Sequence, residues 1–139
     1  MRQTVQLDGA TLTPAEVERV ATNHADVSIS DAAWQRVNIA RDVVDGILAR
    51  GETVYGINTG FGALVHQRIS PDDLATLQTN LIRSHATGLG EPMTRASVRA
   101  MMVVRINSLV KGHSGVHPEV LEQLVSFLNH DIIPYVPRI

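Results

Sequence analysis

The chain has 139 residues, of which 44% are hydrophobic and 19% are charged, and its formal net charge is −2 at pH 7. This composition predicts one globular domain over residues 1–139, and its scattered basic residues argue against a nucleic-acid groove. The sequence has no cysteine, which excludes disulfides and zinc–thiolate clusters. No apolar run approaches the ~20 residues of a membrane span, and the N-terminus lacks a signal-peptide core, so we expect a cytoplasmic location.

The first half of the chain predicts a short strand and two helices. Residues 3–8 alternate in polarity and end in an Asp-Gly turn signal, which indicates a strand or the arm of a β hairpin. A capping box with proline at the first helical position predicts a helix over residues 13–23. Ser28 or Ser30 then caps a longer helix, which apolar residues at helical spacing extend to Gly51.

The second half predicts three more helices. Ser70-Pro71, followed by two acidic residues, starts a helix that ends near Gly88. Thr94 caps a helix that ends at Gly112, and His117-Pro118 opens a final one. The expected fold class is therefore all-α, a helical domain with a short β strand or hairpin at its N-terminus.

The helix expected after Thr94 is apolar around almost its whole circumference. Its middle reads AMMVVRI, and Arg99 and Arg105 flank the apolar residues. Five helices cannot cover so much apolar surface, so the helix predicts a missing partner: a second chain, a symmetry mate or the rest of a longer protein. If Arg105 is buried, it must be paired.

The segment VYGINTGFGALV, residues 54–65, indicates a packed loop that presents a side chain. It combines Tyr55 with Gly56, Gly60 and Gly62. A phenol has a pKa of ~10 and acts as a base near neutral pH only where its surroundings favour the phenolate. Two interpretations of Tyr55 are open, a catalytic group on a mobile loop or a tyrosine packed beside a turn. A phosphate loop is excluded, because neither GxGxxG nor GK[ST] is present.

Ser84 and His85 form the second candidate. His85 lies on an apolar stripe near the C-terminal end of its helix, where the helix dipole favours the protonated imidazole and burial opposes it. Two interpretations of His85 are open, a core histidine or a binding residue. A helical serine such as Ser84 commonly hydrogen-bonds to its own backbone. His85 is not part of an HxxxH pair, and no paired-carboxylate spacing accompanies it, so we expect no metal site.

Three segments in this order resemble the aromatic amino acid lyase family: YGINTGFG, LQTNLIRSHATGLGEP and VRINSLVKGHSG. The resemblance extends from about residue 30 to the end of the chain. It implies a mostly helical fold, assembled as a homotetramer around a long helical bundle. The implied activity is elimination of ammonia from histidine, phenylalanine or tyrosine, or the related aminomutase reaction. The implied electrophile is methylidene-imidazolone (MIO), which the family forms from an internal Ala-Ser-Gly.

The resemblance also implies roles for the candidate residues. Tyr55 matches the tyrosine that removes the β-carbon proton, on a loop whose glycines let it move. Ser84-His85 falls where the family selects the substrate ring, and this pair resembles the members that convert L-histidine to urocanate and ammonia. Tyrosine-specific members tend to carry His-Leu there, and phenylalanine-specific members Phe-Leu. Pairing of His85 with the substrate imidazole is chemically sensible, because it disfavours an unmatched ring.

The chain departs from the family in length. Family members are much longer, and this sequence stops at Ile139, before the Ala-Ser-Gly segment, which it contains nowhere. We therefore expect the chain to be inactive alone. Three hypotheses remain open: one piece of a split or cleaved lyase completed by a second chain, an inactive truncated fragment, or an interaction module that binds a full-length lyase.

Overall fold

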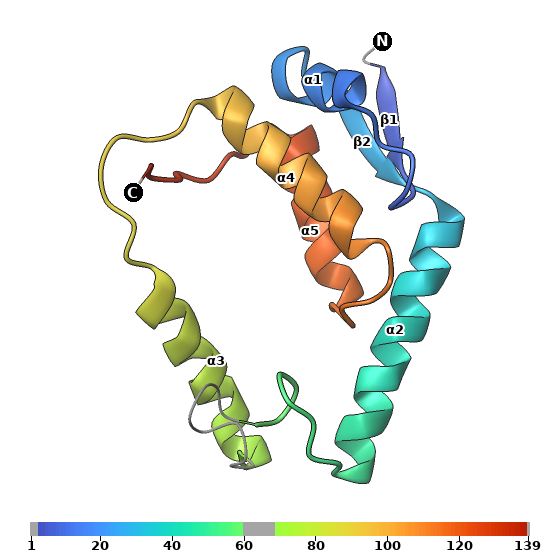
Figure 1. Cartoon of the computed structure of the whole chain (residues 1–139), viewed down its shortest axis with the longest axis vertical. Coiled ribbons are helices and arrows are strands. Elements are labelled where there is room, and N and C mark those ends of the chain that lie inside the picture. The colour runs from blue at the N-terminus through green and yellow to red at the C-terminus, as the bar shows by residue number, and fades with distance from the viewer. Residues whose placement is uncertain (1–2, 60–68, 139) are drawn as a thin grey trace.

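The computed structural model describes residues 3–59 and 69–138. These residues form two short strands and five helices (Figure 1), in the order β1 (Thr4–Leu7), α1 (Pro14–Thr22), β2 (Asp26–Ile29), α2 (Asp31–Arg50), α3 (Pro71–His85), α4 (Arg95–Leu109) and α5 (Pro118–Asn129). The predicted class, all-α with a short β element at the N-terminus, is confirmed.

Local capping signals set the helix starts. Thr13 and Glu16 form the predicted capping box, in which Thr13 Oγ1 accepts from the Glu16 N–H at 3.3 Å and Glu16 Oε2 accepts from the Thr13 N–H at 2.9 Å. Ser30, Ser70 and Thr94 cap α2, α3 and α4 in the same way, each by accepting a hydrogen bond from a backbone N–H of the first turn. Of the two serines considered for α2, Ser30 is the cap and Ser28 lies in β2.

The predicted first strand is confirmed, and its partner lies beyond α1. β1 pairs with β2 in parallel, with Val5 opposite Val27, so a crossover through α1 replaces the alternative of a hairpin. β2 is only four residues long and was not predicted. The Asn129 side chain completes it from α5, because its Oδ1 accepts from the Val27 N–H at 2.8 Å and its Nδ2 donates to the Val27 carbonyl at 2.9 Å.

An aliphatic core surrounds α4, which packs against α1 and α5. The body of the molecule, as we use the term, comprises β1, α1, β2, α4 and α5. On the inner face of α4, Val103 and Ile106 are fully buried, and Leu7 and Leu121 meet them in the same cluster. Arg99 is the arginine of α4 that is buried, whereas Arg105 is exposed.

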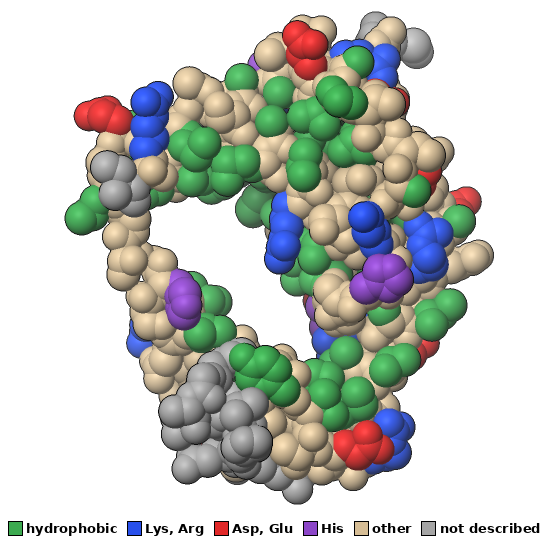
Figure 2. Space-filling view, in the orientation of Figure 1, with side chains coloured by type: hydrophobic (Ala, Val, Ile, Leu, Met, Phe, Trp, Pro, Cys, Tyr) green, Lys and Arg blue, Asp and Glu red, His purple; other side chains and the backbone are tan. Residues whose placement is uncertain are grey.

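The second half of α2 and α3 extend from this body as an arm, residues 45–59 and 69–88 (Figure 1). Figure 2 shows an opening between the arm and the body. Of the α3 side chains that the structure describes, Leu77 and Leu81 are half-buried and the others are exposed. In the described part of the chain, no helix combines the length and the apolar character needed to cross a membrane.

The structure also leaves apolar side chains of α4 exposed, as the sequence predicts. Met101 and Val104, on the helix face turned away from the core, remain 48% and 50% exposed. The expectation that the helices of this chain leave part of α4 uncovered is therefore confirmed for the described residues.

Candidate active site

Tyr55 lies in a tight turn directly after α2, and its residue is 61% exposed. The next residue, Gly56, has a φ of +78°, a left-handed conformation that favours glycine. A Cβ added to Gly56 would meet nothing within 4 Å, so the backbone conformation and not lack of space calls for glycine there. Gly60 and Gly62 lie outside the described residues. The tyrosine is thus presented on a turn and is not packed into the core.

Asn58 anchors this turn, and the sequence analysis missed it. Its Oδ1 accepts a hydrogen bond from the Val54 N–H at 2.9 Å, and its Nδ2 donates to the Glu52 carbonyl at 2.6 Å. Its own carbonyl accepts from the Ile69 N–H at 3.1 Å, and the residue is 5% exposed. Asn58 therefore ties the end of α2, the tyrosine turn and the segment before α3 together. The available signal was its residue type, because asparagine side chains commonly bond to nearby backbone in turns.

A charged pair marks the point where the loop leaves α2. The Arg50 guanidinium donates to the Glu52 carboxylate, and this hydrogen bond lowers the pKa of Glu52 below its ordinary value. Glu52 therefore stays ionised over the whole physiological range. The backbone carbonyl of Glu52 accepts the hydrogen bond from Asn58 Nδ2. Glu52 therefore belongs both to the ion pair with Arg50 and to the hydrogen bonds that anchor the turn.

Ser84 and His85, in the last turn of α3, both hydrogen-bond to one backbone carbonyl group. His85 Nδ1 lies 2.8 Å from the Leu81 carbonyl oxygen, and Ser84 Oγ donates to the same oxygen at 2.9 Å. A carbonyl only accepts, so His85 Nδ1 carries the proton in this arrangement. Ser84 Oγ, 3.1 Å away, accepts from the same N–H. In the neutral ring, Nε2 is then the hydrogen-bond acceptor.

The two candidates share the arm, with Tyr55 after α2 and Ser84-His85 at the far end of α3. All three side chains are exposed, so His85 is not a core residue in this structure. Tyr55 offers a phenol before α3, and Ser84-His85 offer a hydroxyl and an imidazole with a defined tautomer at the C-terminal end of α3. Among residues 3–59 and 69–138, no group of three or more acidic or histidine side chains is arranged to hold a metal ion.

Comparison with known proteins identifies the family. The sequence model of the family described as "Aromatic amino acid lyase" matches residues 12–139 of this mostly helical chain. The chain belongs to the aromatic amino acid lyase family. It is 44% identical over 138 residues to the histidine ammonia-lyase of Streptococcus pyogenes serotype M5 (strain Manfredo), a match that covers 99% of this chain and 27% of that enzyme.

Solved structures agree with this assignment. Histidine ammonia-lyase from Trypanosoma cruzi superposes with a TM-score of 0.90 at 42% identity, over 97% of this chain and 26% of that chain. Tyrosine aminomutase from Streptomyces globisporus superposes with a TM-score of 0.91 at 37% identity, over 98% of this chain and 26% of that chain. The chain thus corresponds to the N-terminal part of these proteins and spans about a quarter of their length.

Proposed function

We propose that this chain is the N-terminal part of a histidine ammonia-lyase, which eliminates ammonia from L-histidine to give urocanate in the cytoplasm. The whole enzyme requires the remaining three-quarters of the polypeptide, either as a second chain or as a continuation, and acts as a homotetramer. The similarity to histidine ammonia-lyases at 44% and 42% identity supports this proposal. The single observation that carries it is the Ser84-His85 pair, in which the Leu81 carbonyl holds Nδ1 and makes Nε2 the acceptor for a second imidazole.

Tyr55 is the proposed base. As phenolate, it takes the proton from the β-carbon, and the electron pair of that C–H bond forms the new carbon–carbon double bond. The substrate's ammonium group keeps the electron pair of the broken C–N bond and leaves as ammonia. The exposed position of Tyr55 on the Gly56 turn supports this role, because the phenol has to reach a bound substrate. The reaction also needs surroundings that favour the phenolate, since an ordinary phenol has a pKa of ~10.

His85 is the proposed ring-recognition residue. A neutral substrate imidazole offers one N–H donor, and Nε2 of His85 is free to accept it once Nδ1 is held by the Leu81 carbonyl. A phenyl ring has no donor, so it would leave this acceptor unpaired in a closed site, which disfavours phenylalanine. Ser84 supports His85 by occupying the same carbonyl and accepting from Nδ1.

The family's electrophile has to come from outside these 139 residues. MIO supplies an electron-poor carbon that activates the substrate, and the family forms it from Ala-Ser-Gly. That tripeptide is absent from this sequence, so no residue of this chain fits the group. We therefore expect the chain to be inactive until the remaining polypeptide completes it. An inactive fragment or a module that binds a full-length lyase is the alternative.

An aminomutase is the chemical alternative within the family, and it shares the fold. It would return ammonia to the β-carbon and would not release it. The Ser84-His85 pair favours histidine elimination, because the imidazole acceptor is matched to an imidazole donor.

The test is to co-express this chain with the part of the Streptococcus pyogenes enzyme that it does not cover, and to assay L-histidine for urocanate and ammonia. We expect turnover only when both parts are present. Tyr55→Phe should lower turnover by several orders of magnitude while both parts still co-purify. Full activity of that variant would remove Tyr55 from the mechanism. A β-amino acid product would indicate the aminomutase, and no turnover in a well-formed complex would favour the inactive fragment.

A further inference from the structure

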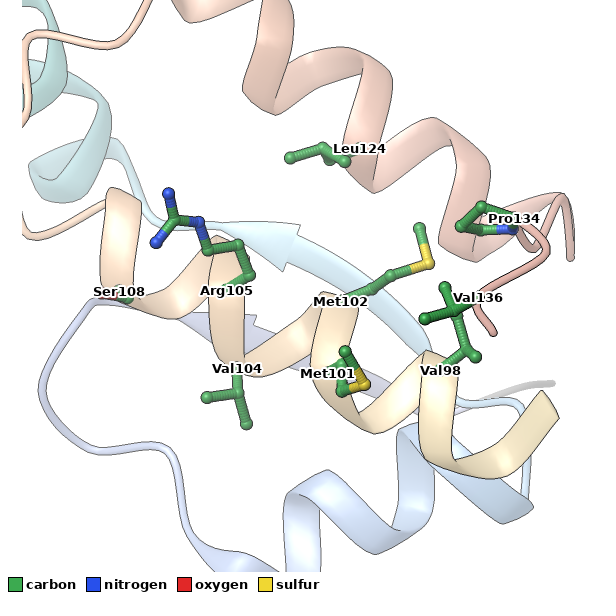
Figure 3. A pocket seen from close by; sticks show the side chains of 9 residues that line it. All are labelled: Val98, Met101, Met102, Val104, Arg105, Ser108, Leu124, Pro134 and Val136. Carbon is green, nitrogen blue, oxygen red and sulfur yellow. The ribbon is translucent and has the colours of Figure 1, made fainter. Parts of the chain in front are cut away.

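An open apolar groove of about 550 Å³ runs along the uncovered side of α4. Figure 3 shows how it is built: Met101 and Val104 come from α4, Leu124 from α5, and Pro134 and Val136 from the segment after α5. Three separate elements therefore converge on one surface. Met101 and Val104 are three residues apart, so they are neighbours on the same helix face. A joint apolar surface of this kind is typical of a binding site and not of ordinary solvent-exposed surface.

One cation stands at the end of this groove. Arg105 and Ser108 line the end of the groove opposite Pro134 and Val136 (Figure 3), and the Arg105 side chain is exposed. Within residues 3–59 and 69–138, Arg105 makes no hydrogen bond or ion pair, whereas Arg95 and Arg99 of the same helix both pair with Asp131. A segment that filled the groove would remove water from Arg105. A desolvated guanidinium is tolerated only with a paired acceptor, and a carboxylate is the best geometric match.

The charges of α4 argue against a second copy of this chain as the occupant. The helix carries three arginines and no aspartate or glutamate. Two copies packed through this face would bring Arg105 of each copy to the interface without a carboxylate from α4 on either side. Such like-charge contacts disfavour the wrong partner by several kcal/mol. The occupant therefore has to bring its own acid.

We infer that the groove is the docking surface for a helix of the remaining lyase polypeptide, which lays apolar side chains against Met101 and Val104 and pairs an Asp or Glu with Arg105. The inference rests on the proposed function, in which residues beyond these 139 complete the enzyme. The relatives have that material, because the chain covers only 27% of the Streptococcus pyogenes enzyme. An amphipathic helix suits a groove between two helices, since it presents anchors at spacings of three and four residues.

The test uses co-expression of this chain with the affinity-tagged remainder of the Streptococcus pyogenes enzyme. The readout is the amount of chain recovered per tagged partner. Val104→Asp places a charge inside the groove, and Arg105→Glu reverses the rim charge; each should reduce recovery at least about tenfold. Arg105→Lys keeps the positive charge, so it should reduce recovery much less than Arg105→Glu. The matched control is Lys111→Glu, an exposed charge reversal two residues beyond α4, which should stay within about twofold of the unmodified chain.

Circular dichroism of each variant shows whether it is folded, and both altered side chains are exposed enough for folding to survive. As a second measurement, the two parts are joined in one polypeptide, where Arg105→Glu should lower the thermal midpoint more than Lys111→Glu. Equal recovery of Arg105→Glu and Lys111→Glu would overturn the inference. Self-association of the unmodified chain that Val104→Asp abolishes would also overturn it, in favour of a second copy.

The docking inference and the proposed function can be contradicted independently of each other. A complex that depends on Val104 and Arg105 but forms no urocanate supports the docking inference and contradicts the proposed function. Urocanate formation that is indifferent to Val104→Asp and Arg105→Glu supports the function and contradicts the docking inference.

Discussion

Arg99 of α4 and Asp131, just after α5, form an ion pair with 3.0 Å between Nη1 and Oδ1. Arg99 is 1% exposed, and it also donates to the Val20 carbonyl at 2.8 Å and to the Leu128 carbonyl at 3.0 Å. One guanidinium thus joins the C-terminal turns of α1 and α5 to α4. Both carbonyls lie where helices end, and that of Leu128 also accepts from the Asp131 N–H at 3.2 Å.

Replacing Asp131 with asparagine should destabilise the body by about 1–3 kcal/mol. Arg99 would remain buried without a counter-charge, which is costly, but the loss is moderated because the Asp131 side chain is 40% exposed. The φ of Asp131 is +57°, a conformation that asparagine tolerates, so the substitution removes charge and leaves the backbone unstrained. Urea unfolding measures the change. Glu52→Gln, which breaks the exposed pair with Arg50, is the control and should cost less stability than Asp131→Asn.

Stability should fall as the pH drops from about 4 toward 2. Backbone N–H groups of Thr11 and Ala10 and the Thr11 hydroxyl lower the pKa of Asp8 to about 2. Burial raises the pKa of Asp131, but the hydrogen bond and charge of Arg95, with the charge of Arg99, outweigh it and lower that pKa overall. A carboxyl group whose pKa is lower in the folded state than in the unfolded state stabilises the fold at pH values above its unfolded-state pKa. That stabilisation is lost as the pH falls through its folded-state pKa.

Urea unfolding across this acid range measures the effect. The slope of unfolding free energy against pH should be smaller for Asp131→Asn than for the unmodified chain. An unchanged slope in this variant would show that Asp131 does not contribute to the acid sensitivity.

The glycines of the segment VKGHSG should prove more sensitive than the glycine beside Tyr55. Gly112 has a φ of +80°, and a Cβ there would lie 2.7 Å from Arg36 Cβ and 2.8 Å from the Arg36 carbonyl oxygen. Gly112→Ala therefore combines backbone strain with a clash against backbone and should cost about 3 kcal/mol or more. Gly56→Ala has a similar φ of +78° with open space around it, and should cost about 1 kcal/mol. Thermal unfolding of the two variants separates backbone strain, which both share, from the steric clash expected only at Gly112. Equal losses of stability would contradict that clash.

The anchor at Asn58 should control the order of the tyrosine turn. Asn58→Ala removes the bonds to the Val54 N–H and the Glu52 carbonyl, each worth about 1 kcal/mol. Amide exchange at Val54 should accelerate by about tenfold, as measured by hydrogen exchange with mass spectrometry. Asn38→Ala, an exposed asparagine in α2, is the control and should leave exchange at Val54 unchanged. Unchanged exchange in Asn58→Ala would show that other contacts hold the turn.

The sequence predicted the helix starts because capping is local. Thr13, Ser30, Ser70 and Thr94 each bond to a residue three positions ahead, within reach of a pattern. β2 could not be recognised in the same way, because four residues carry little pattern and their partner strand lies beyond a helix. The sequence did show that α4 is too apolar for its surroundings, since that follows from composition alone.

Buried polar contacts between distant residues escaped sequence reasoning. The burial of Arg99 depends on a carbonyl 79 residues away in sequence and on Asp131, 32 residues away. Tyr55, Ser84 and His85 were singled out from their local sequence, and the family resemblance supplied their roles, which stay predictions. Asn58 lies inside the same recognised motif, yet only its hydrogen bonds show that it anchors the turn.

In the completed enzyme, His85→Leu should change which ring is accepted. The substitution removes the Nε2 acceptor, so kcat/KM for L-histidine should fall by about 10–100-fold, the cost of one unpaired polar group in a closed site. Phenylalanine brings no donor to that position, so its kcat/KM should stay level or rise. Asn80→Ala, an exposed change on α3, is the control and should alter neither value. Parallel losses for histidine and phenylalanine would mean that His85 supports the arm without selecting the ring.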